Sequence, residues 1–143
     1  MSIIIAAGLL LGAPALESHQ VVLDHQGQRV DVTYRSDLAI KERQVGTASG
    51  PGRQSTLRCA WSAQVSVQRE ARSAAGHVLS RTISSDSPIT GSRSGWCAGQ
   101  REAIASEVAA RGQQVREHLL AVAERDDATL RAELDATHAT VRS

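Results

Sequence analysis

The chain lacks phenylalanine, and among its 143 residues it has one tyrosine and two tryptophans. A core without many aromatic rings must be built from Val, Leu, Ile and Ala, and each of these side chains buries less apolar area than a ring does. The length is that of one domain. The sequence therefore predicts a single small domain with a modest core, in which a covalent cross-link would contribute a large share of the stability.

Lysine occurs once, at Lys41, so nearly all of the 16 basic residues are arginines. Fifteen acidic residues almost cancel them, and the formal net charge is +1 at pH 7. A chain without a basic excess is not expected to bind nucleic acid. No permanent membrane span is predicted either, because a bilayer core needs about 20 apolar residues and the longest apolar stretch, residues 3–16, has only 14.

The first fifteen residues have the pattern of a secretory signal peptide. Residues 3–11 are uncharged and apolar, and Ala13 and Ala15 place small residues at the −3 and −1 positions of a cleavage site. The usual Lys or Arg before the apolar run is missing, so the alternatives are a start further upstream and a buried strand or helix of the mature fold. We expect cleavage after Ala15 and one exported domain over residues 16–143, located in the periplasm or secreted.

The only cysteines are Cys59 and Cys97. An even number of cysteines in an oxidising compartment predicts a disulfide within the chain; two free thiols or an intermolecular bond are the alternatives. Closing this separation of 38 residues would stabilise the fold by roughly 4 kcal/mol on the chain-entropy model.

Apolar and polar residues alternate between residues 20 and 83, which predicts strands with one buried face. The clearest alternation covers residues 56–68. Turns are expected at Gln26 and Gly27, at Ser36 and Asp37, and near Gly76, with a loop over residues 46–55. These signals predict a meander of five antiparallel strands. Along residues 56–68 the expected buried face consists of Leu57, Cys59, Trp61, Ala63, Val65 and Val67.

The segment 85–96 is rich in Ser and Gly and predicts a loop, whereas residues 97–141 have the apolar spacing of a helix. An unbroken helix over this segment would be about 66 Å long, far longer than a compact domain with a radius of gyration of about 14 Å. We therefore expect a break at Asp126 and Asp127, with an Asp as the N-cap of the second part. The alternative is one continuous helix that projects and pairs with another chain.

The apolar sheet face and the apolar helix stripe each need cover, so the predicted fold class is α+β. A five-stranded antiparallel meander packs against the C-terminal helix, over residues 16–84 and 97–141. Cys59 belongs to the buried sheet face and Cys97 precedes the helix. The disulfide would therefore attach the start of the helix to the sheet.

No pattern of residues indicates a catalytic, cofactor or metal site. Between Gly91 and Gly95, Arg93 stands where a nucleophile elbow needs serine. His19 and His25 are six residues apart on an extended strand, about 20 Å, which is too far to share an ion. His118 has no second ligand one helical turn away.

Three arginines, Arg43, Arg58 and Arg69, are expected on or beside the polar face of the sheet. There they form a candidate site for an anionic glycan or a lipid head group. The function we expect is that of an exported, non-catalytic domain that binds another envelope component or itself. The alternatives are the anion binder and a small envelope enzyme whose site assembles from residues distant in the sequence.

Overall fold

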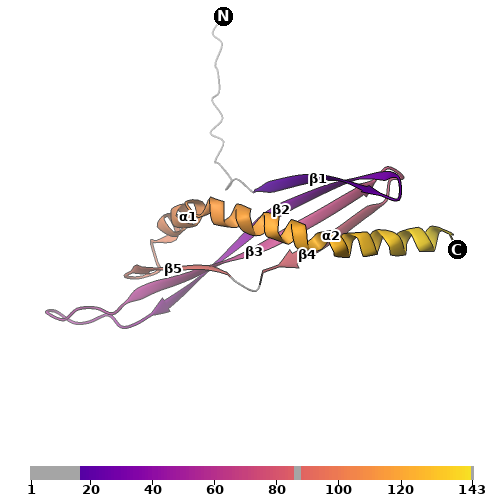
Figure 1. The fold of residues 1–143 in the computed structure, drawn as a ribbon. Helices are drawn as coiled ribbons and strands as arrows, with labels where there is room; N and C mark the ends of the chain where they lie inside the picture. The colour runs from indigo at the N-terminus through magenta and orange to yellow at the C-terminus, as the bar shows by residue number, and fades with distance from the viewer. Residues whose placement is uncertain (1–16, 86–87, 143) are drawn as a thin grey trace, which may run out of the picture.

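The computed structural model describes residues 17–85 and 88–142, so the predicted signal peptide and cleavage site lie outside the described residues. Within these ranges, five antiparallel strands form one long sheet, and two helices lie along one of its faces (Figure 1). The predicted α+β fold is confirmed. The elements are β1 (Ser18–His25), β2 (Gln28–Val45), β3 (Arg58–Ser73), β4 (Val78–Ser84), β5 (Ile89–Ser94), α1 (Arg101–Ala109) and α2 (Gly112–Arg142). Neither helix is long and apolar enough to cross a bilayer, as judged over the described residues.

The strands β1 to β4 follow one another across the sheet, and β5 pairs with β3. Because β2 covers one edge of β3 along its whole length, β4 and β5 share the other edge. β4 pairs with residues 66–72 of β3, and β5 pairs with residues 58–63.

The turn expected at Ser36 and Asp37 is a wrong prediction. β2 is one strand of 18 residues that passes through both positions, and its register with β3 is uninterrupted. The main-chain N–H of Ser36 donates to the carbonyl oxygen of Glu17 at 2.9 Å, and the Ser36 hydroxyl donates to the same oxygen at 3.2 Å. A serine thus remains in the strand on its buried face because both of its donors are satisfied there.

The loop expected over residues 85–96 contains β5, which is a second correction. Gly91 of β5 lies opposite Trp61 of β3, and a Cβ atom at Gly91 would overlap the Trp61 indole ring. Glycine stands at this position of the strand because the indole ring of Trp61 needs the space, and the sequence of residues 89–94 alone carries no sign of this.

The helical segment breaks at residues 110 and 111, and not at Asp126 and Asp127 as predicted. α2 has 31 residues and is about 46 Å long. It fits because β2, with 18 residues, is itself about 60 Å long. Asp126 is buried inside α2 and does not cap a helix. The length argument failed because the molecule is elongated (Figure 1).

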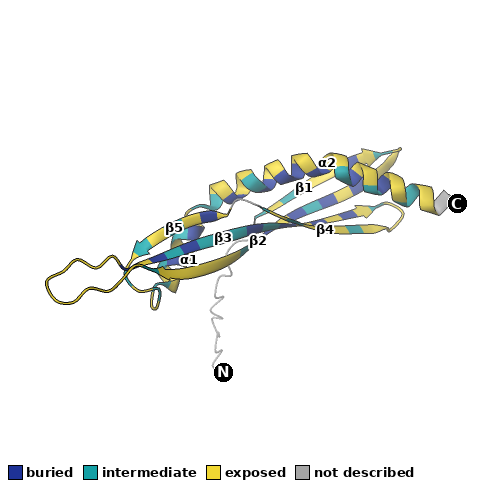
Figure 2. Cartoon of the chain, turned by 90° about the horizontal axis from the view of Figure 1, so that it is seen from below, coloured by how far each residue is buried: buried dark blue, intermediate teal, exposed yellow. Residues whose placement is uncertain are grey.

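The core lies between the sheet and the helices, where Figure 2 shows buried residues along the facing surfaces. One cluster of buried residues lies under α2, and a second surrounds the disulfide under α1. The disulfide between Cys59 and Cys97 is confirmed. The second cluster consists of Cys59, Trp61, Ala63, Val65, Ile89, Ile104, Val108 and Val115.

Candidate functional site

Half of β2 has a strand neighbour on one side only. β1 pairs with residues 28–35 of β2, and the last contact between them joins Ser36 to Glu17. From there to the end of β2, no strand in the described part of the chain lies on that side. We call residues 37–45 the β2 free edge.

The main chain of this edge is directed outward in a regular way. The N–H of Ser36 faces β1, and residues of an antiparallel strand alternate in the side to which their N–H and C=O point. The unbroken register with β3 carries this alternation along the edge. The N–H of Leu38 is accepted by the carboxylate of Asp37 at 3.0 Å. Residues whose main-chain groups face away from β3 are therefore Leu38, Ile40, Glu42 and Gln44.

Apolar side chains are exposed beside these main-chain groups. Ile40 is 41% exposed and, with Glu42, Arg101 and Ile104, it lines an open groove of about 500 Å³ between β2 and α1. Trp96 is 60% exposed at the same end of the sheet. A groove lined by two apolar and two charged side chains, along a row of outward N–H and C=O groups, has the features of a surface that accepts an added strand.

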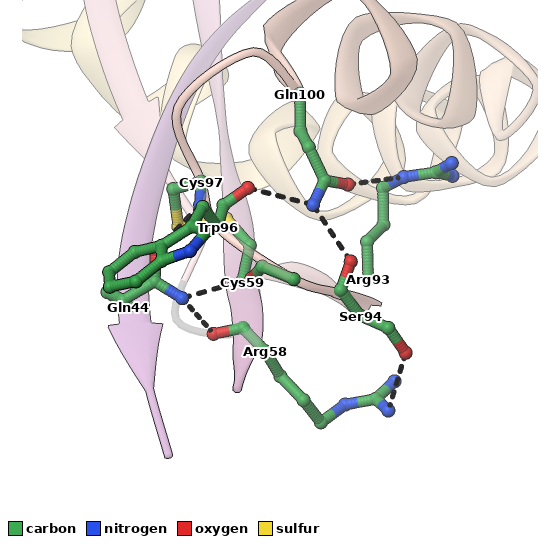
Figure 3. Close-up of a disulfide and its surroundings, with 9 residues drawn as sticks. Gln44, Arg58, Cys59, Arg93, Ser94, Trp96, Cys97 and Gln100 are labelled. Carbon is green, nitrogen blue, oxygen red and sulfur yellow. Dashed lines mark hydrogen bonds between the residues drawn. A yellow bond between two sulfur atoms is a disulfide. The ribbon is translucent and has the colours of Figure 1, made fainter. Parts of the chain in front are cut away.

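Two glutamines fix the backbone around Trp96 (Figure 3). The side-chain amide of Gln44 donates to the carbonyl oxygen of Gly95 at 3.0 Å, and its oxygen accepts the N–H of Cys97 at 2.7 Å. The side-chain amide of Gln100 donates to the carbonyl oxygen of Trp96 at 2.8 Å. The exposed indole is therefore presented on a backbone that is held on both sides.

One group of three side chains near this edge has the spacing of metal ligands. A carboxylate oxygen of Glu42 and the sulfur atoms of Cys59 and Cys97 lie within 4.8 Å of one another, the sole such group in the described ranges. The two sulfurs are bonded to each other. Because zinc binds cysteine as a thiolate, this group holds no metal while the disulfide is intact.

The three arginines of the predicted anion site do not lie together. Arg43 and Arg58 share the outer, uncovered face of the sheet, where Arg58 donates to the hydroxyls of Ser92 at 2.8 Å and Ser94 at 3.3 Å. Arg69 lies on the opposite, buried face, which corrects its predicted position. Arg69 occupies an odd-numbered position, as the buried side chains of β3 do. The alternation of buried and exposed residues along β3 therefore already indicates that Arg69 belongs to the buried face. Anion binding by Arg43 and Arg58 stays a prediction.

Arg69 is the centre of a buried ionic cluster. Its guanidinium, with no exposed side-chain surface, donates to Asp126 at 2.9 Å and to Glu133 at 2.7 Å. The hydroxyl of Tyr34 donates to the same Asp126 carboxylate at 2.9 Å. Burial lowers the pKa of Arg69, but the hydrogen bonds that Arg69 donates to Glu133 and Asp126, together with the charges of these carboxylates, outweigh burial and raise that pKa above its usual value. Burial and the Asp126 carboxylate raise the pKa of Tyr34 above its ordinary range.

A cleft of about 470 Å³ adjoins this cluster between β4 and α2, and Arg81, His118 and Arg125 are among its lining residues. Burial and the nearby charge of Arg125 lower the pKa of His118. Arg81 lies 3.7 Å from the Asp126 carboxylate. The two carboxylates of the cluster thus balance two arginines, and the arrangement is that of an ionic layer holding α2 on the sheet.

Sequence reasoning missed both the free edge and the cluster. The free edge depends on where β1 ends relative to β2, which is a matter of pairing register. The sequence predicts a helix break with an Asp cap at Asp126 and Asp127, because the partner of Asp126, Arg69, lies 57 residues away in the sequence and leaves no local sign of the ion pair. The sequence offers one sign of the cluster, because Asp126 is a charged residue in the middle of the apolar stripe of the helix.

No family model, curated protein or solved structure matches the chain. The class of protein is therefore defined by fold and site alone. It is an elongated, disulfide-linked α+β domain whose sheet has an open edge beside exposed apolar side chains.

Proposed function

We propose that the chain is an exported, non-catalytic domain that binds an extended segment of another envelope protein along the β2 free edge. The observation that carries the proposal is the run of unpaired edge at residues 37–45 beside the exposed side chains of Ile40 and Trp96. Natural proteins usually protect such an edge, and an edge left open beside apolar surface is suited to strand addition.

The disulfide supports the export part of this proposal. A disulfide in a small domain is typical of an oxidising compartment. Cleavage after Ala15 would leave Leu16 as the first residue, directly before Glu17, whose carbonyl oxygen makes the last contact between β1 and β2. The mature chain would then have no further residues ahead of β1 with which to cover the free edge.

The side chains along the edge define the chemistry of the partner. Lys41 and Arg43 lie on the outer face of the sheet, whereas Ile40 lies on the inner face beside the groove. A strand paired with this edge places successive side chains on alternate faces. The best partner has acidic residues on the outer face and apolar residues on the inner one, and each matched pair contributes about 0.2–1 kcal/mol.

A second copy of the chain fits this edge less well. Its β2 continues beyond residues 37–45 in both directions, into the paired segment 28–36 at one end and into the β2–β3 loop at the other. In either orientation, one of these continuations would meet Glu17 and Ser18 of the first copy. A short segment with a free end avoids this collision.

Two synthetic nonapeptides test the proposal, one alternating Val and Glu and the other alternating Val and Lys. We expect the Val/Glu peptide to bind the mature domain more than about tenfold more tightly, as measured by fluorescence anisotropy, because only its charges complement Lys41 and Arg43. Size-exclusion chromatography should show a monomer without the peptide. Absence of Val/Glu binding, or equal binding of both peptides, would refute strand addition at this edge.

Proline substitution localises the binding. The N–H of Ile40 faces away from β3, so Ile40→Pro removes an edge donor without removing a bond between β2 and β3. Val22→Pro is the matched control, because Val22 is 60% exposed on β1 and its N–H faces away from β2. We expect Ile40→Pro to weaken binding of the Val/Glu peptide more than about tenfold and Val22→Pro to leave that binding unchanged. Equal loss in both variants would contradict the site.

A further inference from the structure

Three histidines that are distant in the sequence line one small cavity at the far end of the sheet from the free edge. His25 ends β1, His77 directly precedes β4, and His138 lies near the end of α2. The cavity has a volume of about 140 Å³. The chain has five histidines in all, and three of them line this cavity. The elements that supply them, the β1–β2 and β3–β4 turns and the C-terminal part of α2, lie at the same end of the sheet (Figure 1).

A carboxylate lies beside this cavity. One oxygen of Asp135 is 2.9 Å from Nε2 of His25 and accepts a hydrogen bond from the side-chain amide of Gln26 at 3.0 Å. The Nε2 atom of His25 is buried, and its approach to Asp135 lacks the alignment of a hydrogen bond. A buried imidazole nitrogen with an unused lone pair or proton is costly, and a bound ion would satisfy it.

We propose that His25, His77 and His138, together with Asp135, bind a divalent transition-metal ion, with Zn²⁺ as the expected ion. Imidazole nitrogens and a carboxylate oxygen are ligands that zinc accepts in a tetrahedral site. Neither lysine nor arginine is among the described residues that line the cavity, so no cation there repels the ion.

The site closes by side-chain rotation. No three of these donor atoms lie within 4.8 Å of one another as the side chains stand. His77 is exposed on the turn before β4, and His138 is only partly buried. Both imidazoles can rotate about their side-chain bonds toward His25, which is held beside Asp135. The bound ion would then tie the C-terminal part of α2 to both turns.

Zinc titration of the metal-free, disulfide-linked protein tests the proposal. We expect isothermal titration calorimetry to give one Zn²⁺ per chain, and we expect excess Zn²⁺ to raise the Tm, because an ion that binds only the folded state stabilises it. His77→Ala and His138→Ala should each weaken Zn²⁺ binding more than about tenfold. His19→Ala is the matched control, since His19 lies outside this cavity. Mg²⁺ should produce no shift, because it prefers oxygen ligands.

A spectroscopic measurement makes the outcome independent of stability. X-ray absorption at the zinc edge should show imidazole scattering from three ligands in the intact protein and from two in His77→Ala. His77 is exposed, so this variant should retain the circular dichroism spectrum of the parent. The proposal is overturned if Zn²⁺ neither binds nor raises the Tm, or if His19→Ala weakens binding as much as His77→Ala does.

Discussion

The guanidinium of Arg69 donates from Nε to Oδ2 of Asp126 at 2.9 Å, and the two side chains are only 0% and 2% exposed. This bond joins the C-terminal half of β3 to the middle of α2. Each charge would be costly to bury alone, so an alternative position of the helix would leave both without a partner. The pair therefore sets which part of α2 lies over which part of the sheet, a choice that apolar contacts alone define loosely.

Removing one member of this pair should be strongly destabilising. We expect Arg69→Leu to lower the free energy of unfolding by about 3–5 kcal/mol, because Asp126 would lose its buried cation and keep only the Tyr34 hydroxyl and the more distant, partly exposed Arg81. The double variant Arg69→Leu/Asp126→Leu should recover most of this loss. Urea denaturation of the single and double variants measures both effects.

Arg72→Leu is the matched control on the same strand, since Arg72 is exposed and pairs with exposed Glu70. We expect it to change the stability by no more than about 0.5 kcal/mol. A mild effect of Arg69→Leu, close to that of the control, would show that the buried cluster does not position α2.

The sheet and α1 should depend on each other. Val108 is buried at 5% exposure in the cluster around the disulfide. We expect Val108→Asp to cost several kcal/mol and to unfold the domain, because its charge would be buried without a partner. Ala109→Asp, at the next and exposed position, should keep the parent Tm. Removal of residues 98–143 should give an aggregating sheet, and a soluble, folded product would contradict this packing.

The fold could be predicted where a local pattern and a long-range contact agree. The alternation through Trp61 and Val65 identified the buried face of β3, and the same alternation includes Arg69. Its charge suggested the solvated face, because the compensating carboxylates come from a helix that is remote in the sequence. The glycine at position 91 of β5 likewise depends on a residue that is remote in the sequence, because a side chain there would overlap Trp61 on β3.

The candidate site could not be predicted from the sequence for a related physical reason. An open edge is defined by the strand that ends beside it, and Glu17 and Ser36 meet only in the folded sheet. The expected turn at Ser36 divided β2 into two strands and hid the length of its edge. Composition and spacing carry no information about such a boundary.

The disulfide should contribute substantially to stability. Replacing both Cys59 and Cys97 by Ala should lower the free energy of unfolding by roughly 4 kcal/mol, because the bridge closes a separation of 38 residues in the unfolded chain. Denaturation of the variant and of the parent measures the difference. Intact mass after alkylation should show no reactive thiol in the unreduced parent, and two reactive thiols would argue against the bond.

His118 should make the domain less stable in acid. Burial, assisted by Arg125, lowers the pKa of His118 below the usual value of 6.5. The unfolded chain therefore takes up a proton near pH 6.5 that the folded chain does not accept, and stability falls as the pH drops below that value. We expect His118→Gln to reduce the loss of Tm between neutral and mildly acidic pH. His19→Gln serves as control, and an unchanged pH profile in His118→Gln would contradict this assignment.

The mature chain should begin at Leu16. Ala13 and Ala15 form the small pair at the −3 and −1 positions after the apolar run, and signal peptidase requires small residues there. We expect N-terminal sequencing of the exported protein to start at Leu16, and we expect Ala15→Leu to accumulate the uncleaved chain. Ala7→Leu, within the apolar run, should be processed normally. Cleavage should also affect peptide binding, because it removes the residues ahead of β1 that would otherwise be available to cover the β2 free edge. The Val/Glu peptide should therefore bind the processed form more tightly than the Ala15→Leu form. An exported protein that still begins at Met1 would disprove the cleavage.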